Sequence, residues 1–382
     1  TIVGLITGWF VTLAGNMQTI YAFTKGYTGE DVVPFWTVLW NPSEFFSRVS
    51  EGMARYWYAN ATRFIPFTIH EFPSYSFVVS DIHGHVLSIP FALLAIALLI
   101  ELFSSTESVK MFSELGAGEH GISALFTNPI TKTVLLYGFL VAVLLMTNAF
   151  DGPIYALIFA ILLAGLYWYP RRKKRDWWVY IETLVPLGMI GVVAACTALP
   201  FLMHFSSFAT GIGVNCPPSG LENSTFGPFV FEGLEKCQKS PLWMMWLLWG
   251  FFWFSGIALF IPSITKRMDV GVRRFLKILY LYGIVMIIIP EFFYAKDIYP
   301  AHFRSNTMFK LGYQAFMMWS IVSVQTMASV IVNRNRMSKH SDPNRKKSRV
   351  WYSRIVVIFS SIPPRWVRGV YLVLLVPQVV LV

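Results

Sequence analysis

Long apolar runs separated by short polar breaks dominate this chain from its first residue onward. A helix needs about 20 apolar residues to cross a bilayer, and most of the runs approach that length. They lie at about 1–23, 86–104, 131–149, 152–170, 178–203, 242–264, 275–293 and 308–333. A weaker run over 351–382, broken by prolines and arginines, indicates a re-entrant turn or a short helical hairpin. We therefore predict an all-α polytopic integral membrane protein, with about 8–9 transmembrane helices in a single domain over residues 1–382.

The composition excludes the main soluble classes of protein. Apolar residues make up 55% of the 382 residues and charged residues only 13%, with a mean hydropathy of +0.55. Soluble domains carry about 25% charged residues. A soluble enzyme, a disordered chain and a nucleic-acid binder are therefore excluded, despite the formal net charge of +11. Because both ends of the chain fall inside apolar runs, with no Met start or signal peptide, we expect a piece of a longer protein or one chain of a split one.

Basic residues cluster after the fourth, sixth and eighth predicted spans. The clusters are Arg171, Arg172, Lys173, Lys174 and Arg175, then Lys266, Arg267, Arg273 and Arg274, and finally the basic loop 334–350. Cytoplasmic loops are enriched in Lys and Arg, so all three clusters are predicted to be cytoplasmic. We interpret them as anchors on anionic membrane lipids.

The opposite side, extracytoplasmic or lumenal, then receives the segments 24–85, 149–152, 204–241 and 294–307. Cys216 and Cys237 fall in one of these loops and could form a disulfide in an oxidising compartment. The sequons at Asn60 and Asn223 fall on the same side. Ionisable groups near membrane depth are costly and mark functional sites, and in this chain they concentrate on the outer side. We therefore predict that the active side is the outer side.

The first outer loop contains a predicted interfacial helix. Asn41-Pro42 is a typical helix start, and Phe46, Val49, Met53 and Trp57 follow at spacings of three and four. These four residues share one apolar face, as in an amphipathic helix that lies in the membrane interface. The helix is either a plain anchor or a platform over which a lipid substrate moves.

An acidic residue and two histidines alternate just before the second span. Asp81, His83 and His85 share one face of an extended backbone, where they could hold a divalent metal such as Mg or Mn. The alternative is that Asp81 caps the helix and the histidines lie in the interface. Glu71 lies a few residues upstream.

Two further polar groups lie on the outer side. Asp151, in the tight turn before the fourth span, either caps that span or binds substrate. Arg304, Thr307 and Lys310 are spaced by three residues near a predicted helix start, which suits a phosphate or pyrophosphate. The alternative is that Arg304 and Lys310 extend to lipid headgroups. Neighbouring candidates are His204, Glu291, Lys296, Asp297 and Asn306.

Several segments together resemble the YYY membrane protein family, a domain of unknown function grouped with the GT-C glycosyltransferases. Residues 68–73 and 80–87 resemble its TINEFP…GDLHPHV stretch, and residues 148–152 resemble its TNTWD turn. Residues 200–213 resemble PFLLHF…GIG, and residues 304–315 resemble RMNTVFKFYYQAW. His70 replaces the usual Asn, Gly84 the usual Pro and Ser305 the usual Met.

The resemblance implies a GT-C-like fold and sugar transfer from a polyprenyl-phosphate donor on the outer face. Arg304 and Lys310 would clamp the phosphate, and the carboxylate that activates the acceptor would be Glu71, Asp81, Asp151 or Glu291. The other substrate-binding candidates are His83, His85, His204, Lys296, Asp297 and Asn306. The family places an acidic loop upstream of the point where this chain begins, so the general base could lie outside it.

A second hypothesis is a non-catalytic membrane subunit that keeps the fold within a larger complex or beside an N-terminal partner chain. It differs from the first in predicting no sugar transfer at all.

Overall fold

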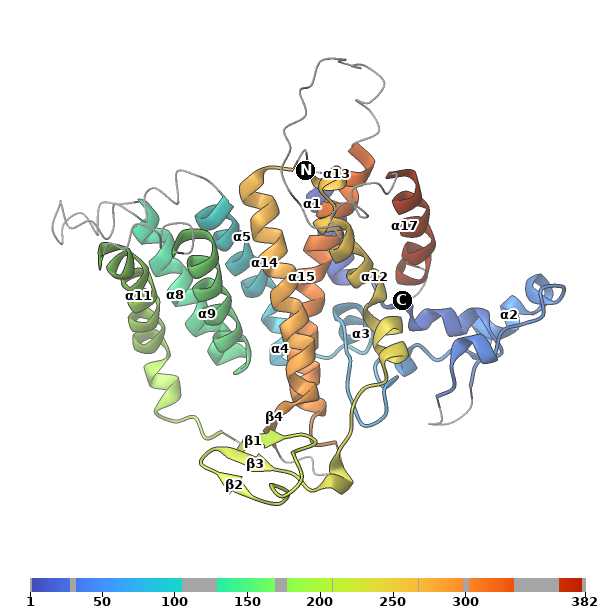
Figure 1. The fold of residues 1–382 in the computed structure, drawn as a ribbon, viewed down its shortest axis with the longest axis horizontal. Coiled ribbons are helices and arrows are strands. Elements are labelled where there is room, and N and C mark those ends of the chain that lie inside the picture. The colour runs from blue at the N-terminus through green and yellow to red at the C-terminus, as the bar shows by residue number, and fades with distance from the viewer. Residues whose placement is uncertain are drawn as a thin grey trace, which may run out of the picture. The chain divides into compact units, whose positions relative to one another are not determined.

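The computed structural model describes residues 2–27, 32–104, 129–168, 177–207, 209–266, 268–297, 302–332 and 364–379 (Figure 1). The predicted basic clusters at 171–175 and 334–350 lie outside these residues. The chain divides into two compact units. The first unit is Thr1–Ser80, Ala209–Met268 and Val285–Val382, and the second is Asp81–Phe208 and Asp269–Ile284. Each unit is described by itself.

The second unit consists of helices. They are α4 (Gly84–Leu87), α5 (Ile89–Ser104), α8 (Pro129–Thr147), α9 (Asp151–Leu162), a π-helical turn (Leu163–Trp168), α11 (Trp177–Leu202) and most of α14 (Val270–Ile288). Helix α8 packs against α5, α9 and α11. Buried tyrosine hydroxyls need partners in this apolar interior. Tyr137 Oη therefore donates to the carbonyl of Tyr155 at 2.7 Å, and Tyr282 Oη to that of Ile154 at 2.8 Å.

Two glycines of the second unit permit close backbone approaches. A Cβ on Gly84 would lie 2.1 Å from the carbonyl oxygen of Thr147, and one on Gly152 would lie 2.6 Å from Cβ of Leu145. A Cβ cannot occupy either position, so these glycines set the spacing of α4 and α9 from α8.

The first unit is built around α15 (Ser305–Val332), which packs against α1 (Ile2–Leu13), α12 (Leu242–Phe260), α13 (Pro262–Thr265) and α17 (Pro364–Val379). Its other helices are α2 (Phe45–Arg55), α3 (Pro73–Val78) and 3-10 helices at Met17–Phe23, Phe35–Thr37, Tyr58–Ala61, Leu234–Lys236 and Ile289–Glu291. Its core is aromatic: Phe252 lies against Phe316 and Trp319, with ring centroids 5.3 and 5.9 Å apart. The amphipathic helix predicted from residue 41 is α2, which begins four residues later.

The described chain is mostly helical, as predicted, and the first unit also contains a four-stranded sheet that the prediction of an all-α fold omitted. Its strands are β1 (Gly211–Val214), β2 (Thr225–Phe226), β3 (Phe229–Phe231) and β4 (Phe293–Lys296), in the order β2-β3-β1-β4. Strand β1 pairs in parallel with β3 and antiparallel with β4. The loop backbone thereby satisfies its hydrogen bonds across segments that are distant in sequence. Such short strands lack a clear alternating pattern.

Four helices of the described chain are long and apolar enough to cross a membrane: Gly84–Phe103, Ile130–Thr147, Thr183–Leu202 and Leu242–Phe260. Each coincides with a predicted span. Shorter apolar helices lie at Ile2–Leu13 and Asp151–Gly165. A total of about 8–9 spans stays a prediction.

The predicted first span over 1–23 is wrong in extent, because α1 ends at Leu13. Asn16 caps the 3-10 helix that follows, and its side chain accepts a hydrogen bond from the backbone N–H of Gln18 at 3.0 Å.

We expect Gly84→Ala to destabilise the protein by about 1–3 kcal/mol, because the new Cβ must displace the backbone of α8. Gly191→Ala is the matched control in α11, where an added Cβ meets nothing within 4 Å. The control should be neutral or slightly stabilising. Thermal unfolding in detergent measures both variants, and equal melting temperatures would contradict the close approach of α4 to α8.

Candidate functional site

A buried ion pair lies where α15 begins in the first unit. Arg304 directly precedes α15 and is 1% exposed, and its Nη1 lies 2.8 Å from Oε2 of Glu291. Burial lowers the pKa of Arg304 while Glu291 raises it, and the guanidinium remains charged at any relevant pH. Glu291 ends the 3-10 turn that follows α14. The pair therefore joins the segment after α14 to the start of α15.

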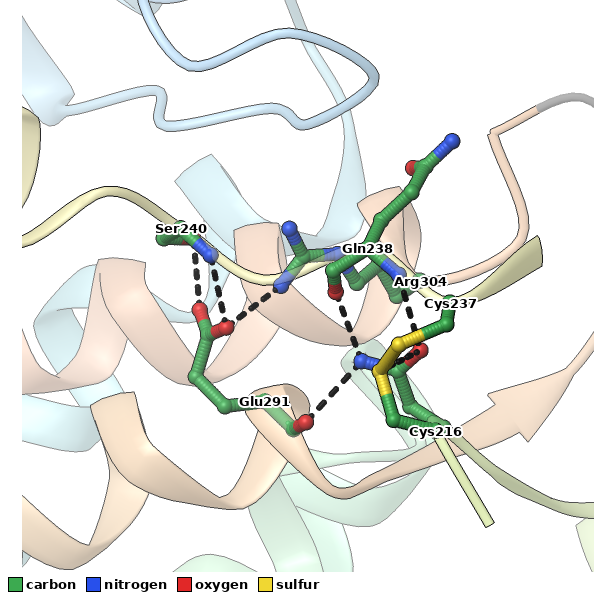
Figure 2. The surroundings of a disulfide bond; sticks show 7 residues. Cys216, Cys237, Gln238, Ser240, Glu291 and Arg304 are labelled. Carbon is green, nitrogen blue, oxygen red and sulfur yellow. Dashed lines mark hydrogen bonds and ion pairs between the residues drawn. A yellow bond between two sulfur atoms is a disulfide. The ribbon is translucent and has the colours of Figure 1, made fainter. Parts of the chain in front are cut away.

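The carboxylate of Glu291 has two further partners on Ser240. The Ser240 N–H donates to Oε2 at 2.9 Å and its hydroxyl donates to Oε1 at 2.6 Å. Figure 2 shows the carboxylate between Ser240 and Arg304. A carboxylate with three donors, one of them a guanidinium, is held as an anion in a fixed position.

A disulfide loop is fixed against the same turn. Cys216 and Cys237 are joined by a disulfide, with Cα atoms 4.5 Å apart. The amide of Asn215 donates to the carbonyls of Gln238 at 2.7 Å and of Glu291 at 2.9 Å (Figure 2). The loop, the turn and α15 are therefore connected through Glu291.

His70 is a buried imidazole with no hydrogen-bond partner on either ring nitrogen among the described residues. Its ring lies beside Trp249, with centroids 6.2 Å apart. Burial, and then the positive charges of Arg304 and Arg63, lower the pKa of His70 to about 3. The Nε of Arg304 is likewise buried without a partner in the described chain. A neutral imidazole and a cation with an unused donor thus lie within electrostatic range of each other.

Glu71 follows His70, and its Oε1 lies 3.5 Å from Nη1 of Arg63. Its side chain is 12% exposed. The structure therefore places one predicted catalytic carboxylate in the same loop as the buried imidazole, and the charge of Arg63 acts on both.

The residues that begin α15 have separate contacts. Ser305 donates to the carbonyl of Phe67 at 2.7 Å, and the Thr307 hydroxyl accepts from the Ala295 N–H at 2.9 Å. Lys310 is half-buried with its Nζ 4.8 Å from the centroid of the Phe309 ring, and Asn306 is half-buried in the first turn. Within the predicted phosphate clamp of Arg304 and Lys310, Arg304 is already paired with the carboxylate of Glu291. This pairing was not predicted from the sequence.

Lys296 belongs to a second ion-pair cluster in the first unit. The Glu232 carboxylate is buried and lies 3.1 Å from both Lys236 and Lys296. Burial would raise the pKa of Glu232, but the two lysines and the nearby Tyr294 hydroxyl outweigh it and lower that pKa. Burial, with the nearby charges of Glu232 and Asp297, raises the pKa of Tyr294. The charge of Lys296 therefore acts on Glu232, and the charge of Asp297 acts on Tyr294.

Asp81, His83 and His85 come together in the second unit. His83 Nδ1 contacts Oδ1 of Asp81, and His85 Nε2 lies 3.4 Å from Oδ2. The imidazole rings are nearly parallel with centroids 6.0 Å apart. Each histidine approaches a different carboxylate oxygen, and His83 is exposed while His85 is buried. Two imidazoles and one carboxylate suit Mn better than Mg. Metal binding here stays a prediction.

The remaining candidates of the second unit are Asp151 and His204. Asp151 is fully buried and is the first residue of α9; its Oδ1 accepts from Nδ2 of Asn148 at 2.8 Å. The Asp151 N–H donates to the carbonyl of Asn148 at 2.8 Å. These two bonds close the turn between α8 and α9. His204 is exposed just beyond α11.

Sequence analysis missed His70, Ser240 and Asn215. His70 stands where the resembled family has Asn, which is the one signal that could have identified it. Ser240 and Asn215 lie in a loop with no motif of their own, so their contacts with Glu291 emerge only in the folded chain.

We expect His70 to make the protein less stable in acid. The unfolded chain binds a proton near pH 6.5, whereas the folded chain does so only near pH 3. Stability is therefore intact above pH 6.5 and falls between 6.5 and 3, by up to about 1.4 kcal/mol per pH unit.

His70→Asn should remove this part of the pH dependence, and unfolding in detergent between pH 7 and pH 5 measures it. The exposed His302 provides the control variant His302→Asn, which should keep the wild-type slope. If the two variants show the same slope, His70 is not buried in its neutral form.

Comparison with known proteins gives a family match. A family model described as "Uncharacterized membrane protein (DUF2298)" matches residues 1–273 and 257–319. No curated protein and no solved structure matches the chain. The match confirms the resemblance to a membrane protein family and, with the apolar helices, identifies an integral membrane protein. The grouping with GT-C glycosyltransferases stays a prediction. The chain belongs to the uncharacterized membrane protein family DUF2298.

Proposed function

We propose that this protein is a GT-C-type glycosyltransferase module that transfers a sugar from a polyprenyl-phosphate donor on the outer face of the membrane. The observation that carries the proposal is Arg304, a buried guanidinium at the start of a long helix, with an unused Nε and within electrostatic range of a neutral imidazole. An unused buried donor is unfavourable, by about 1–3 kcal/mol. A phosphate oxygen would satisfy it.

The surroundings of Arg304 support an anion as its ligand. Its contact with Glu291 uses Nη1 alone, although a guanidinium has five N–H donors in a fixed fork. The first-turn amides of α15 lack intrahelical acceptors, and the helix dipole there favours negative charge. His70 adds a nitrogen that can donate a hydrogen bond without adding charge. Arg304 would hold the donor phosphate, and Glu291 would fix the position of Arg304.

The proposed reaction places negative charge where this cation lies. The acceptor hydroxyl gives its proton to a carboxylate, for which we propose Glu71, and the acceptor oxygen forms a bond to the anomeric carbon. The bond between that carbon and the lipid-phosphate oxygen breaks, and its electron pair stays on the phosphate. Arg304 stabilises the charge that develops there, as electrostatic catalysis requires.

The second candidate function is that of a non-catalytic membrane subunit. The complete engagement of the Glu291 carboxylate by Arg304 and Ser240 favours it, because such a pair can serve only to fix the disulfide loop. The two candidate functions differ in whether the Nε of Arg304, which does not contact Glu291, binds a ligand.

We expect Arg304→Lys to lower sugar transfer at least about 100-fold, because lysine keeps the charge beside Glu291 but lacks Nε and the planar fork. Glu71→Gln should cause a loss of about 10²–10⁴-fold through the missing base. Transfer is measured with radiolabelled polyprenyl-phosphate sugars and the full-length protein in liposomes. Glu222→Gln is the control, because this half-buried carboxylate of the disulfide loop accepts a local hydrogen bond from the Gly220 N–H at 2.6 Å and has no assigned role; it should keep full activity.

If both variants transferred sugar at the wild-type rate, the roles assigned to Arg304 and Glu71 would be refuted. Absence of transfer by the wild-type protein from every donor tested would favour the subunit hypothesis. Melting temperatures of all variants separate a loss of activity from a loss of fold.

A further inference from the structure

A small cavity lies in the first unit, between the 3-10 helix Met17–Phe23 and α2. Its volume is about 250 Å³, and its lining includes Gln18, Lys25, Tyr27, Arg55 and Tyr56. Drug-sized ligands occupy pockets of about 300–1,000 Å³. The cavity is thus too small for a whole lipid but large enough for a headgroup.

The polar wall of the cavity is fixed by buried hydrogen bonds. The Gln18 side chain is fully buried; its Nε2 donates to Tyr27 Oη at 3.1 Å, and its Oε1 accepts from Tyr56 Oη at 2.6 Å. Because Tyr27 accepts from Gln18, its own O–H proton remains available for a ligand. Burial raises the pKa of Tyr27, against the smaller opposite effect of the Gln18 hydrogen bond, so this hydroxyl stays a donor.

Helix α2 packs closely against the backbone at Ala22 and Thr24. A Cβ on Gly52 would lie 2.7 Å from the carbonyl oxygens of both Ala22 and Thr24. Only glycine permits this approach. The cavity is therefore bounded by backbone on two sides.

Positive charge is concentrated at the cavity. Lys25, Arg48 and Arg55 all lie over the ring of Trp40, at 5.9, 5.4 and 5.9 Å from its centroid. One carboxylate serves this cluster: Glu51 lies 3.6 Å from Arg48 and 3.1 Å from Arg55. Lys25 and Arg55 both line the cavity, and the described residues that line it include no acidic side chain. An anion would relieve the repulsion among these cations.

The same region exposes large apolar side chains. Phe46 on α2 is 88% exposed, and Met53 and Trp57 are also exposed. An amphipathic helix with exposed aromatic and aliphatic residues is typical of the membrane interface, at the depth of lipid phosphates. A cationic cavity beside such a helix differs from a site for a soluble anion, because its rim can contact acyl chains.

We propose that this cavity binds the phosphate group of an anionic phospholipid, with Lys25 and Arg55 pairing with the phosphate oxygens and Tyr27 donating a hydrogen bond. None of the described residues that line the cavity is assigned to sugar transfer. The inference therefore does not rest on the proposed function, and either can fail without the other.

The test measures binding of the full-length protein in detergent to short-chain phosphatidylglycerol, phosphatidylcholine and inorganic phosphate. The wild-type protein should prefer phosphatidylglycerol. The double variant Lys25→Met with Arg55→Met should weaken its binding at least about tenfold, because two ion pairs are lost. Arg48→Met removes a cation from the same cluster that does not line the cavity, and it should change binding less than about twofold.

Tyr27→Phe keeps the proposal testable if the double variant does not fold, because it removes one hydroxyl alone. It should weaken phosphatidylglycerol binding by about three- to tenfold. Equal effects of Arg48→Met and of the double variant, or wild-type binding by Tyr27→Phe, would overturn the proposal. Inorganic phosphate binding as tightly as the lipid would also overturn it, since the site would then recognise a free anion.

Discussion

The ion pair between Glu291 and Arg304 is the interaction on which the first unit depends. It joins three segments: the turn after α14, the start of α15 and, through Ser240, the segment that follows the disulfide loop. Burial makes such a pair costly unless both charges are hydrogen-bonded, and loss of one partner leaves the other as an isolated buried charge. The carboxylate is fully engaged and the guanidinium is not. This asymmetry is why we look for a ligand on the side of Arg304.

The other cations of the first unit also differ in how far nearby carboxylates balance their charge. Lys296 and Lys236 both lie 3.1 Å from the buried Glu232, so one carboxylate serves two cations. Lys25 and Arg55 belong to a cluster in which three cations share one carboxylate. The lysines beside Glu232 both pair directly with that buried carboxylate, whereas Lys25 lies in a cluster with a larger excess of cations beside exposed apolar side chains, which suits anionic lipid. The ratio of carboxylates to cations, rather than the number of cations, distinguishes structure from binding.

Much of the helical fold follows from sequence because run length alone identifies a spanning helix. All four long apolar helices coincide with predicted runs, and Asp81 meets its histidines because they are close in sequence. The sheet was missed because its strands are two to four residues long and pair across distant segments. The extent of the first span was wrong because Asn16 offers a local cap that hydropathy ignores. Glu291 and Arg304 were both predicted as site residues, but nothing in their spacing indicates that they form an ion pair.

His70 bears on the choice between the two candidate functions. A purely structural interior has no use for an imidazole whose two nitrogens lack partners in the described chain, because leucine or phenylalanine would fill the space without desolvating polar atoms. The resembled family has Asn there, which also carries a donor and an acceptor of no net charge. A neutral polar group within electrostatic range of Arg304 can donate a hydrogen bond to a bound anion without adding charge of its own. Two buried residues, each with unused nitrogen atoms, are harder to explain as scaffold than either would be alone, and they favour the transferase over the subunit.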